Sequence, residues 1–351
     1  MKDKIHLALF FGGQSGEHEV SRVSAYNIVG AIDPQKYQLT LIGITKKGKM
    51  IRYTGPLDAI PGGEWENNRG YLVEAMDFFN DPFLQSIDIC FPVLHGPMGE
   101  DGTIQGLFEL INKPYVGCGV LSSAVGMDKH FSKLAFERAG IPTGPYQAYH
   151  SYQYVEDPES FMADIQKRLN YPIFVKPANM GSSVGISKVH THEELQPALE
   201  LAFEYDHKII VEAGIDGHEI ECAILEDGDT LRASTPGQIV ASKEFYDYEA
   251  KYSDDEDSEI IIPAPLDPQT TEDIKTYAIK AFRAIEGSGL SRVDFFVEKT
   301  TGEIFINEIN TLPGFTNISM YPKMWEADGI PYKTLVDRLI QSASRKIKTR
   351  D

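Results

Sequence analysis

The chain has 351 residues, and its 33 basic and 52 acidic side chains give a formal net charge of −19. This length predicts two or three domains. The negative charge argues against broad binding to a nucleic-acid backbone or an anionic membrane, because either partner requires a basic face. The three cysteines contain no Cys-x-x-Cys pair, so neither a zinc knuckle nor a disulfide framework is indicated.

The first part of the chain alternates apolar runs with helical patterns, which is typical of a parallel α/β layer. Its opening apolar run, residues 5–11, is too short to span a membrane and lacks a cleavage-site pattern. We therefore expect a buried strand and a cytoplasmic protein. This N-terminal domain is placed at residues 1–125. Its expected strands are 5–11, 39–44 and 87–93, and its expected helices are 17–31 and 103–111.

Two further domains are expected, over residues 126–208 and 209–351, with the first boundary near residues 120–127. The second domain contains two strands around a Gly-Ser loop, and the third is rich in strands. An acidic cluster at 254–259 is typical of solvated surface. The expected helices are 128–139, 160–169, 193–203 and 332–344, and the expected strands are 173–176, 185–189, 209–212 and 219–225.

Residues 291–310 form two apolar runs around a glycine-containing turn, which predicts a β-hairpin. A three-residue loop at 300–302 would give Gly302 the left-handed conformation that glycine adopts readily. That loop pairs Lys299 with Glu303. Counting outward from it sets the register of the whole hairpin.

The same register pairs Asp294 with Glu308 and Arg292 with Asn310. Strand side chains alternate between two faces, so these four residues would share one face. Two carboxylates opposite each other repel unless a cation lies between them, and hard oxygen ligands suit Mg²⁺. We therefore predict a metal site at Asp294, Glu308 and Asn310.

The alternative for these residues is a polar strip that faces solvent. It fits poorly, because the intervening apolar residues do not form a clean second face: Val293, Phe295, Ile306 and Ile309. A one-residue slip of the register would place Asp294 and Glu308 on opposite faces and remove the metal site.

A second candidate site is Lys176 followed by the glycine-rich loop 181–185. Glycines let backbone amides approach phosphate oxygens, and a lysine can reach the same phosphates. The loop does not match the P-loop pattern, and an ordinary hairpin turn remains an alternative. Glu212 and Glu219 could bind adenine and ribose, or be ordinary exposed glutamates.

The N-terminal loop 11–17 suggests a dinucleotide site, but position 11 is Phe11 where the Gly-x-Gly-x-x-Gly pattern requires glycine. Hydride transfer is therefore disfavoured. The loop can still present Glu17 at a helix start, where a buried carboxylate could hold a substrate ammonium. Helix capping by Ser15 or Glu17 is the alternative.

Several segments across nearly the whole chain resemble, in the same order, motifs of the D-alanine:D-alanine ligase family. They are residues 12–21, 94–96, 99–102, 127–129, 175–177, 181–185, 246–252 and 308–316. The resemblance implies the three-domain ATP-grasp fold. In that fold, two α+β domains close over ATP beside an N-terminal α/β domain with a parallel sheet.

The resemblance also implies roles for individual residues. The ATP-binding set is Lys129, Lys176, Ser182, Ser183, Phe245 and Lys251 around the phosphates and nucleotide, with Glu212 at the adenine and Glu219 at the ribose. Two Mg²⁺ ions, which Mn²⁺ could replace, are assigned to Asp294, Glu308 and Asn310. For the amino acids, the resemblance implies that Glu17, His95 and Ser182 bind the first D-alanine. Arg292 and the backbone near Gly314 would stabilise developing negative charge. Ser319 would help bind the carboxylate of the second D-alanine.

Two positions bear on details of the resemblance. Many family members carry lysine after the adenine-side glutamate, whereas this chain has Ala213, which puts one adenine contact in doubt. Tyr252 faces the active site in the family, and relatives that make D-alanyl-D-lactate replace it. Its presence favours D-alanine as second substrate, and residues 244–259 are expected to form a mobile lid.

The expected activity is therefore ATP-dependent ligation of two D-alanines through an acyl phosphate, for peptidoglycan precursor synthesis. The same chemistry with D-lactate or D-serine as acceptor is the near alternative, and a nucleotide-binding sensor without turnover is the distant one. The family resemblance also implies a homodimer.

Overall fold

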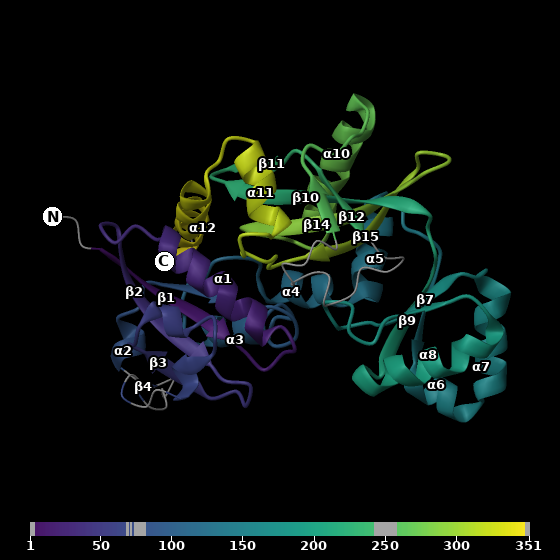
Figure 1. The fold of residues 1–351 in the computed structure, drawn as a ribbon, viewed down its shortest axis with the longest axis horizontal. Helices are drawn as coiled ribbons and strands as arrows, with labels where there is room; N and C mark the ends of the chain where they lie inside the picture. Colours follow the sequence, from purple (N-terminus) through teal and green to yellow (C-terminus); the bar gives the residue numbers. More distant parts are fainter. Residues whose placement is uncertain (1–3, 68–69, 71, 74–81, 242–257, 348–351) are drawn as a thin grey trace.

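The computed structural model describes residues 4–67, 70, 72–73, 82–241 and 258–347. Its three β-sheets lie in different parts of the molecule, the N-terminal sheet at the left of Figure 1, the C-terminal sheet at the top and the central sheet at the lower right. Phe245, Lys251, Tyr252 and residues 244–257 of the predicted lid lie outside the described residues, whereas its last two residues, 258 and 259, begin a strand of the C-terminal sheet.

The N-terminal sheet has the strand order β4-β3-β2-β1-β5, and β1 pairs in parallel with both β2 and β5. Seven of the eight residues of β1 are buried, because helices or loops cover both faces of the sheet. The predicted parallel layer is confirmed. Its strands are β1 (Ile5–Gly12), β2 (Tyr37–Ile44), β3 (Met50–Tyr53), β4 (Leu72–Val73) and β5 (Ile89–Val93), and its helices are α1 (His18–Ala31), α2 (Pro82–Gln85), α3 (Thr103–Leu110) and two short 3₁₀ turns, Leu57–Ala59 and Glu64–Asn67.

The central sheet has the order β6-β9-β7-β8 and packs one face on its helices through a separate apolar core. The predicted boundary between residues 208 and 209 falls inside β9, which pairs with both β6 and β7. This sheet therefore includes residues up to 213. Its strands are β6 (Tyr146–His150), β7 (Ile173–Pro177), β8 (Ser187–Val189) and β9 (Lys208–Ala213), and its helices are α6 (Ser151–Glu156), α7 (Pro158–Arg168) and α8 (His192–Tyr205).

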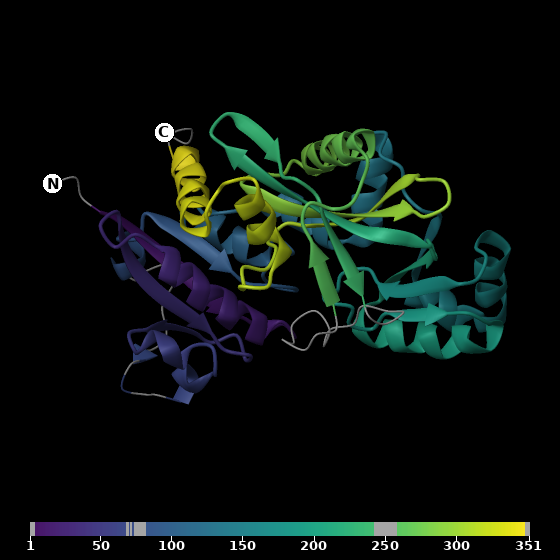
Figure 2. The same ribbon diagram turned by 45° about the horizontal axis from the view of Figure 1, so that its top comes forward.

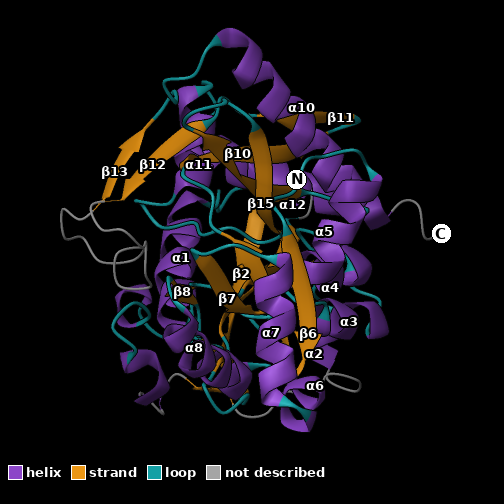
Figure 3. Cartoon of the chain, turned by 90° about the vertical axis from the view of Figure 1, so that its right-hand side faces the viewer, coloured by secondary structure: helices purple, strands orange, loops and turns teal. Residues whose placement is uncertain are grey.

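The C-terminal sheet has the order β13-β12-β10-β14-β15, with β11 paired to β10. Figure 3 shows β12 and β13 at one edge of this sheet. Its strands are β10 (Gly217–Asp227), β11 (Thr230–Ala233), β12 (Gly237–Ala241), β13 (Ser258–Ile261), β14 (Leu290–Glu298) and β15 (Ile304–Asn310), and its helices are α10 (Pro268–Ala284), α11 (Met320–Ala327) and α12 (Tyr332–Ile347).

Helix α4 (Val120–Met127) occupies the segment where a domain boundary was predicted, and α5 (Lys129–Arg138) follows it directly. Both contact β15, so they pack with the C-terminal sheet although they precede the central sheet in sequence. Phe136 of α5 belongs to the apolar core under that sheet. Figure 2 shows the central sheet, in teal at the lower right, to one side of the C-terminal sheet.

The N-terminal and C-terminal sheets share one apolar core. It combines Leu9 and Phe91 of the N-terminal sheet with Trp325 of α11 and Leu339 of α12, all fully buried. Within the described residues, no helix is long and apolar enough to cross a membrane.

Candidate functional site

The β14–β15 hairpin pairs Asp294 with Glu308 and Arg292 with Asn310, which confirms the predicted pairing of these residues. All four are partly exposed, whereas their neighbours on β14 are buried. They therefore occupy one face of the hairpin. Glu221 of β10 lies opposite Asp294 and extends this polar face to a third strand.

The predicted register at the turn is wrong. Glu298, instead of Lys299, donates its backbone N–H to the carbonyl of Glu303 over 2.9 Å. The N–H of Gly302 in turn reaches the carbonyl of Glu298, so the loop spans four residues, 299–302. Gly302 has the predicted left-handed backbone, with φ of 74°.

A β-bulge restores the register before the polar face. Phe295 pairs with Ile306 and Asp294 with Glu308, so Asn307 is the extra residue. The bulge turns both Ile306 and Ile309 into the core, although they are three positions apart. Because of the bulge, all four alternate residues are buried, Val293 and Phe295 as well as the two isoleucines. They do form a clean apolar face, so the contrary expectation is wrong. A regular strand could not bury both isoleucines.

The polar face is a compact cluster of charges. Arg292 donates from Nε and Nη2 to the two carboxylate oxygens of Asp294, each over 2.7 Å, and its Nε lies 3.1 Å from Oε2 of Glu221. Burial opposes the charge of Arg292, but the two carboxylates hold its pKa above its ordinary value. Lys129 places Nζ 3.5 Å from Oε2 of Glu308.

The donor set of this face fits a divalent cation. Its three carboxylates outnumber the two cations Arg292 and Lys129, so one negative charge remains in excess. Asn310 donates its amide nitrogen to Asp294 over 3.0 Å, which leaves the amide oxygen as its available ligand atom. Among the described residues, no group of three His, Cys, Asp or Glu side chains could hold a metal. A cation here would therefore also need phosphate or water oxygens, as Mg²⁺ commonly does.

The glycine-rich loop has an unusual backbone. Ser182 and Ser183 both have positive φ, 50° and 59°, a conformation that side chains other than asparagine and aspartate rarely adopt. Strain of this kind is found where a loop must present its amide or hydroxyl groups in a fixed direction. Lys129 supports the loop by donating from Nζ to the carbonyl of Met180 over 2.7 Å.

Ser182 connects the central domain with the N-terminal domain. Its hydroxyl donates to Oε1 of Glu17, which lies at the start of α1 and is buried. A Cβ at Gly96 or Gly181 would lie 2.4 Å or 2.9 Å from Oε2 of Glu17, so both glycines leave room for this carboxylate. Glu17 makes no side-chain cap to α1, so its capping alternative is wrong.

His95 is held as a neutral imidazole. Its Nδ1 lies 3.0 Å from the carbonyl of Leu312, which can only accept, so Nδ1 carries the hydrogen. Nε2 then accepts from the hydroxyl of Ser24 at 3.1 Å. Burial lowers the pKa of His95, and the charge of Glu17 only partly opposes this shift.

Glu100 connects the loop that carries His95 with the loop that follows β15. Its two carboxylate oxygens accept the backbone N–H groups of Gly96, over 2.7 Å, and Leu312, over 3.2 Å. Burial and the charge of Glu17 raise the pKa of Glu100 to about 8. Glu100 was part of a recognised motif but had no assigned role.

On the nucleotide side, Glu212 of β9 is held between two lysines. Lys133 reaches Oε1 with Nζ at 2.7 Å, and Lys176 reaches Oε2 at 2.5 Å. Burial alone would raise the pKa of Glu212, but the two lysines lower it to about 2. Glu219 lies two residues before Glu221 on β10, on the same face.

Gly314 and Ser319 lie in the loop after β15. Ser319 Oγ accepts the backbone N–H of Thr316 at 3.0 Å, and their hydroxyls are 2.8 Å apart. A Cβ at position 314 would lie only 2.8 Å from Ser319 Oγ, so Gly314 leaves the space that this hydroxyl occupies.

The sequence pattern missed two buried charges of this site, Lys133 and Glu221. Both could have been found by periodicity, since Lys133 is four residues after Lys129 on a predicted helix and Glu221 is two after Glu219 on a predicted strand.

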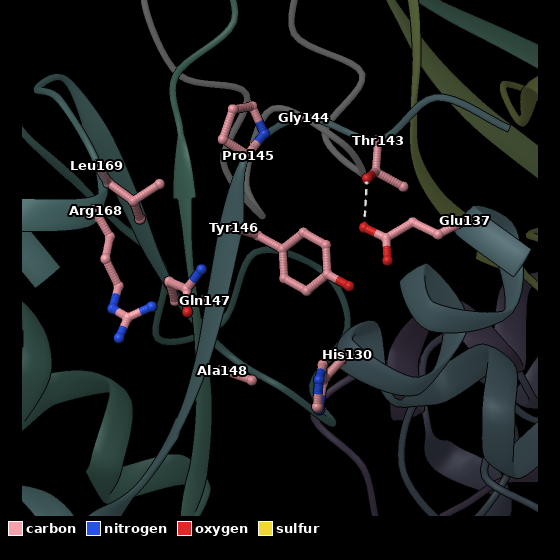
Figure 4. Close-up of a pocket in the computed structure, with 10 residues that line it drawn as sticks. All are labelled: His130, Glu137, Thr143, Gly144, Pro145, Tyr146, Gln147, Ala148, Arg168 and Leu169. Carbon is pink, nitrogen blue, oxygen red and sulfur yellow. Dashed lines mark hydrogen bonds between the residues drawn. The ribbon is translucent and has the colours of Figure 1, made fainter. Parts of the chain in front are cut away.

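Two of the surface hollows on the described residues lie outside the site, although Tyr146, which lines the first, pairs with Glu212. One, of about 550 Å³, lies between α5 and β6 and is lined by Glu137, Tyr146 and Arg168 (Figure 4). The other, of about 490 Å³, lies beside α1 and is lined by Arg22 and Glu66. Neither is lined by a predicted site residue.

The family models for the N-terminus and the C-terminus of D-Ala-D-Ala ligases match residues 6–118 and 135–341. The chain belongs to the D-alanine–D-alanine ligase family. This membership confirms the resemblance seen in the motifs.

Curated members of the ligase family align over nearly the whole chain. A D-alanine–D-alanine ligase from Ruminiclostridium cellulolyticum is 50% identical and covers 97% of this chain and 95% of its own. One from Acetivibrio thermocellus is 49% identical, with coverages of 99% and 97%.

Solved structures of D-alanine ligases share the fold. The VanG D-Ala:D-Ser ligase from Enterococcus faecalis is 38% identical, with a TM-score of 0.88 and coverage of 97% of this chain and 100% of that one. The D-alanine–D-alanine ligase from Coxiella burnetii is 36% identical, with a TM-score of 0.86 and coverages of 99% and 96%. The predicted ATP-grasp fold class, α/β and α+β, is confirmed.

Proposed function

We propose that the protein uses ATP to join two D-alanines into D-alanyl-D-alanine for peptidoglycan precursor synthesis. The observation that carries this proposal is the contact between Glu17 and Ser182. It places a buried carboxylate, suited to an amino-acid ammonium, against the hydroxyl of a loop suited to phosphate. An amino acid and a polyphosphate would thus meet at one point.

The chemistry follows from the weak electrophilicity of a carboxylate. An oxygen of the first D-alanine carboxylate attacks the γ-phosphorus of ATP, ADP leaves and an acyl phosphate forms. The free amine of the second D-alanine then attacks the acyl carbon, and the carbon–oxygen bond to phosphate breaks. Catalysis of this kind rests on positioning and electrostatics.

Residues of this chain have separate roles in these steps. Glu17, with Ser182 and His95, would bind the first D-alanine, whose carboxylate then faces the glycine-rich loop. Arg292 and the backbone at Gly314 would stabilise the negative charge on the tetrahedral carbon's oxygen. Ser319 would bind the second carboxylate, and Tyr252 would face the acceptor.

Asp294, Glu308 and Asn310 would hold two Mg²⁺ ions, with Mn²⁺ as a possible substitute. These ions would neutralise phosphate charge when bound. The oxygen donors and the excess negative charge of the hairpin face support this assignment.

The nucleotide would lie between the central and C-terminal sheets. Lys129, Lys176, Lys251 and the loop residues Ser182 and Ser183 would contact its phosphates. Phe245 and Glu212 would lie at the adenine, and Glu219 at the ribose. Since both oxygens of Glu212 bind lysines, its role at the adenine would be indirect unless one lysine moves.

The acceptor is the second question. Similarity to a D-Ala:D-Ser ligase makes D-serine the specific alternative to D-alanine, with D-lactate behind it. Tyr252 favours D-alanine. Curated relatives named D-alanine–D-alanine ligase are more similar to this chain, at 50% and 49% identity.

We also propose that the enzyme works in the cytoplasm, as a homodimer. Exposed large apolar side chains on consecutive segments support a subunit interface: Met98, Leu110, Leu121, Phe131 and Leu134.

The deciding measurement is phosphate release from ATP and Mg²⁺ with D-alanine, and with L-alanine as control. D-Alanine should stimulate release, and mass spectrometry should find D-alanyl-D-alanine. In mixtures with D-serine or D-lactate, the D-alanine dipeptide should dominate. Equal rates with the two alanine isomers in a folded sample would refute ligase activity, and a mainly mixed product would refute the acceptor assignment.

A further inference from the structure

Lys133 is a buried lysine outside the motifs described above. Its side chain is only 3% exposed, and its Nζ lies 2.7 Å from Oε1 of Glu212. Lys176 occupies the other oxygen of the same carboxylate. The two lysines thus share one carboxylate, and the charges of Glu308 and Glu219 also act on Lys176.

The two lysines come from different parts of the fold. Glu212 and Lys176 lie on the paired strands β9 and β7, where Glu212 is opposite Phe174, two residues before Lys176. Both therefore project from the same face of the central sheet. Lys133 lies on α5, which packs against β15 and α10 of the C-terminal sheet. It reaches Glu212 from outside the central sheet.

The surroundings of the lysines also differ. Lys176 immediately precedes the segment that leads to the glycine-rich loop, and its side chain is 12% exposed. Lys133 is more enclosed, with 3% of its side chain exposed, although each lysine lies over an aromatic ring, with Nζ 5.6 Å from the ring centre of Tyr146 or Phe174. Of the two, Lys176 is placed to move toward a phosphate, and Lys133 is placed to stay.

We propose that Lys133 is a positioning residue that keeps Glu212 neutralised, so that Lys176 can leave Glu212 and bind the phosphates of ATP. This inference rests on the proposed function, which assigns Lys176 to the phosphates. A buried carboxylate without a partner is strongly unfavourable. Without Lys133, Glu212 would retain Lys176 and remove it from the nucleotide.

The test compares Lys133→Gln and Lys133→Met with the wild-type enzyme. Both variants remove the charge, and Gln keeps a hydrogen-bond donor in case Met prevents folding. The KM for ATP should rise about tenfold or more, while the KM for D-alanine stays within about threefold. Adenosine, which has no phosphate, is expected to inhibit the wild type and both variants equally.

Lys208→Met is the matched control. Lys208 is also a buried lysine, and its Nζ lies 2.9 Å from each carboxylate oxygen of Asp128, so this pair likewise joins β9 to α5. Its loss should lower the melting temperature about as much as the loss of Lys133. The KM for ATP should change by less than about twofold, because Lys176 keeps its surroundings.

Three results would overturn the inference: an unchanged KM for ATP in Lys133→Gln, an equal rise in Lys208→Met, or adenosine binding weakened as much as ATP binding. The last would mean that Lys133 merely supports the adenine pocket. Calorimetric binding of ATP with Mg²⁺ gives the same comparison without turnover. If the wild type and Lys133→Gln bind ATP equally, this inference fails whether or not the enzyme turns over. If the wild type binds ATP more tightly but forms no dipeptide, only the ligase activity fails.

Discussion

Glu17 shows how a residue's role depends on a partner remote in sequence. Its carboxylate accepts from Ser182, 165 positions away, and two glycines leave the space that it occupies. The local sequence is equally compatible with helix capping, because a glutamate at a helix start can serve that purpose. The contact with the second domain decides between the two.

Glu100 gives a prediction for pH. Its pKa of about 8 lies above the ordinary value of 4.5, because of burial and the charge of Glu17. The folded protein therefore keeps a proton that the unfolded chain has released, and stability falls as pH rises from about 4.5 to 8. Glutamine at position 100 cannot titrate, so the Glu100→Gln variant should lose this pH dependence. Between pH 6 and 8, the unfolding free energy of the wild type should fall by roughly 2 kcal/mol more than that of the variant.

Urea denaturation at pH 6, 7 and 8 measures this difference. The wild-type midpoint should fall more steeply with pH than the Glu100→Gln midpoint. Parallel slopes for the two proteins would show that Glu100 is ionised throughout this range, as its two backbone N–H donors favour.

At the level of elements, the β14–β15 hairpin explains a partial success. Counting from the turn predicts the correct partners for Asp294 and Arg292, although the turn register is wrong by one residue. The bulge at Asn307 compensates for that difference. Burial of both Ile306 and Ile309 is the physical reason for the bulge, because a regular strand would expose one of them.

Helix α5 carries Lys129 and Lys133, and Asp128 fixes its start. Oδ1 of Asp128 accepts the N–H groups of His130 and Phe131, each over 3.0 Å, and both oxygens bind Lys208. Asp128→Ala should therefore reduce the unfolding free energy by about 3 kcal/mol. Asp128→Asn keeps a capping oxygen and should cost less. Urea denaturation of both variants checks this order, and equal losses would show that the cap contributes nothing.

At the scale of the whole molecule, the sheets do not correspond to three independent cores. The N-terminal and C-terminal sheets share one core, each has a further core on its other face, and the central sheet has its own core with α7 and α8. We therefore expect the central part to unfold separately from the rest. Both tryptophans, Trp65 and Trp325, are fully buried in the shared core and report on it alone.

Two core substitutions test this division. Leu339→Ala in the shared core should shift the unfolding transition seen by tryptophan fluorescence, since it costs about 2–5 kcal/mol. Leu199→Ala in the central core should leave that transition in place and lower only a second one, seen by circular dichroism. A single transition that both variants shift equally would mean that the chain unfolds as one unit.

The sequence by itself determined many of the elements, though not the long helix α10, and it determined the family and the polar face of the hairpin. These follow from apolar periodicity and from motifs, which are local in the chain. Only the tertiary structure decided that α4 and α5 pack on the C-terminal sheet, that β9 belongs to the central sheet and that Lys133 neutralises Glu212. Such contacts join residues on separate elements, and their energies depend on burial and distance, which local sequence patterns do not contain.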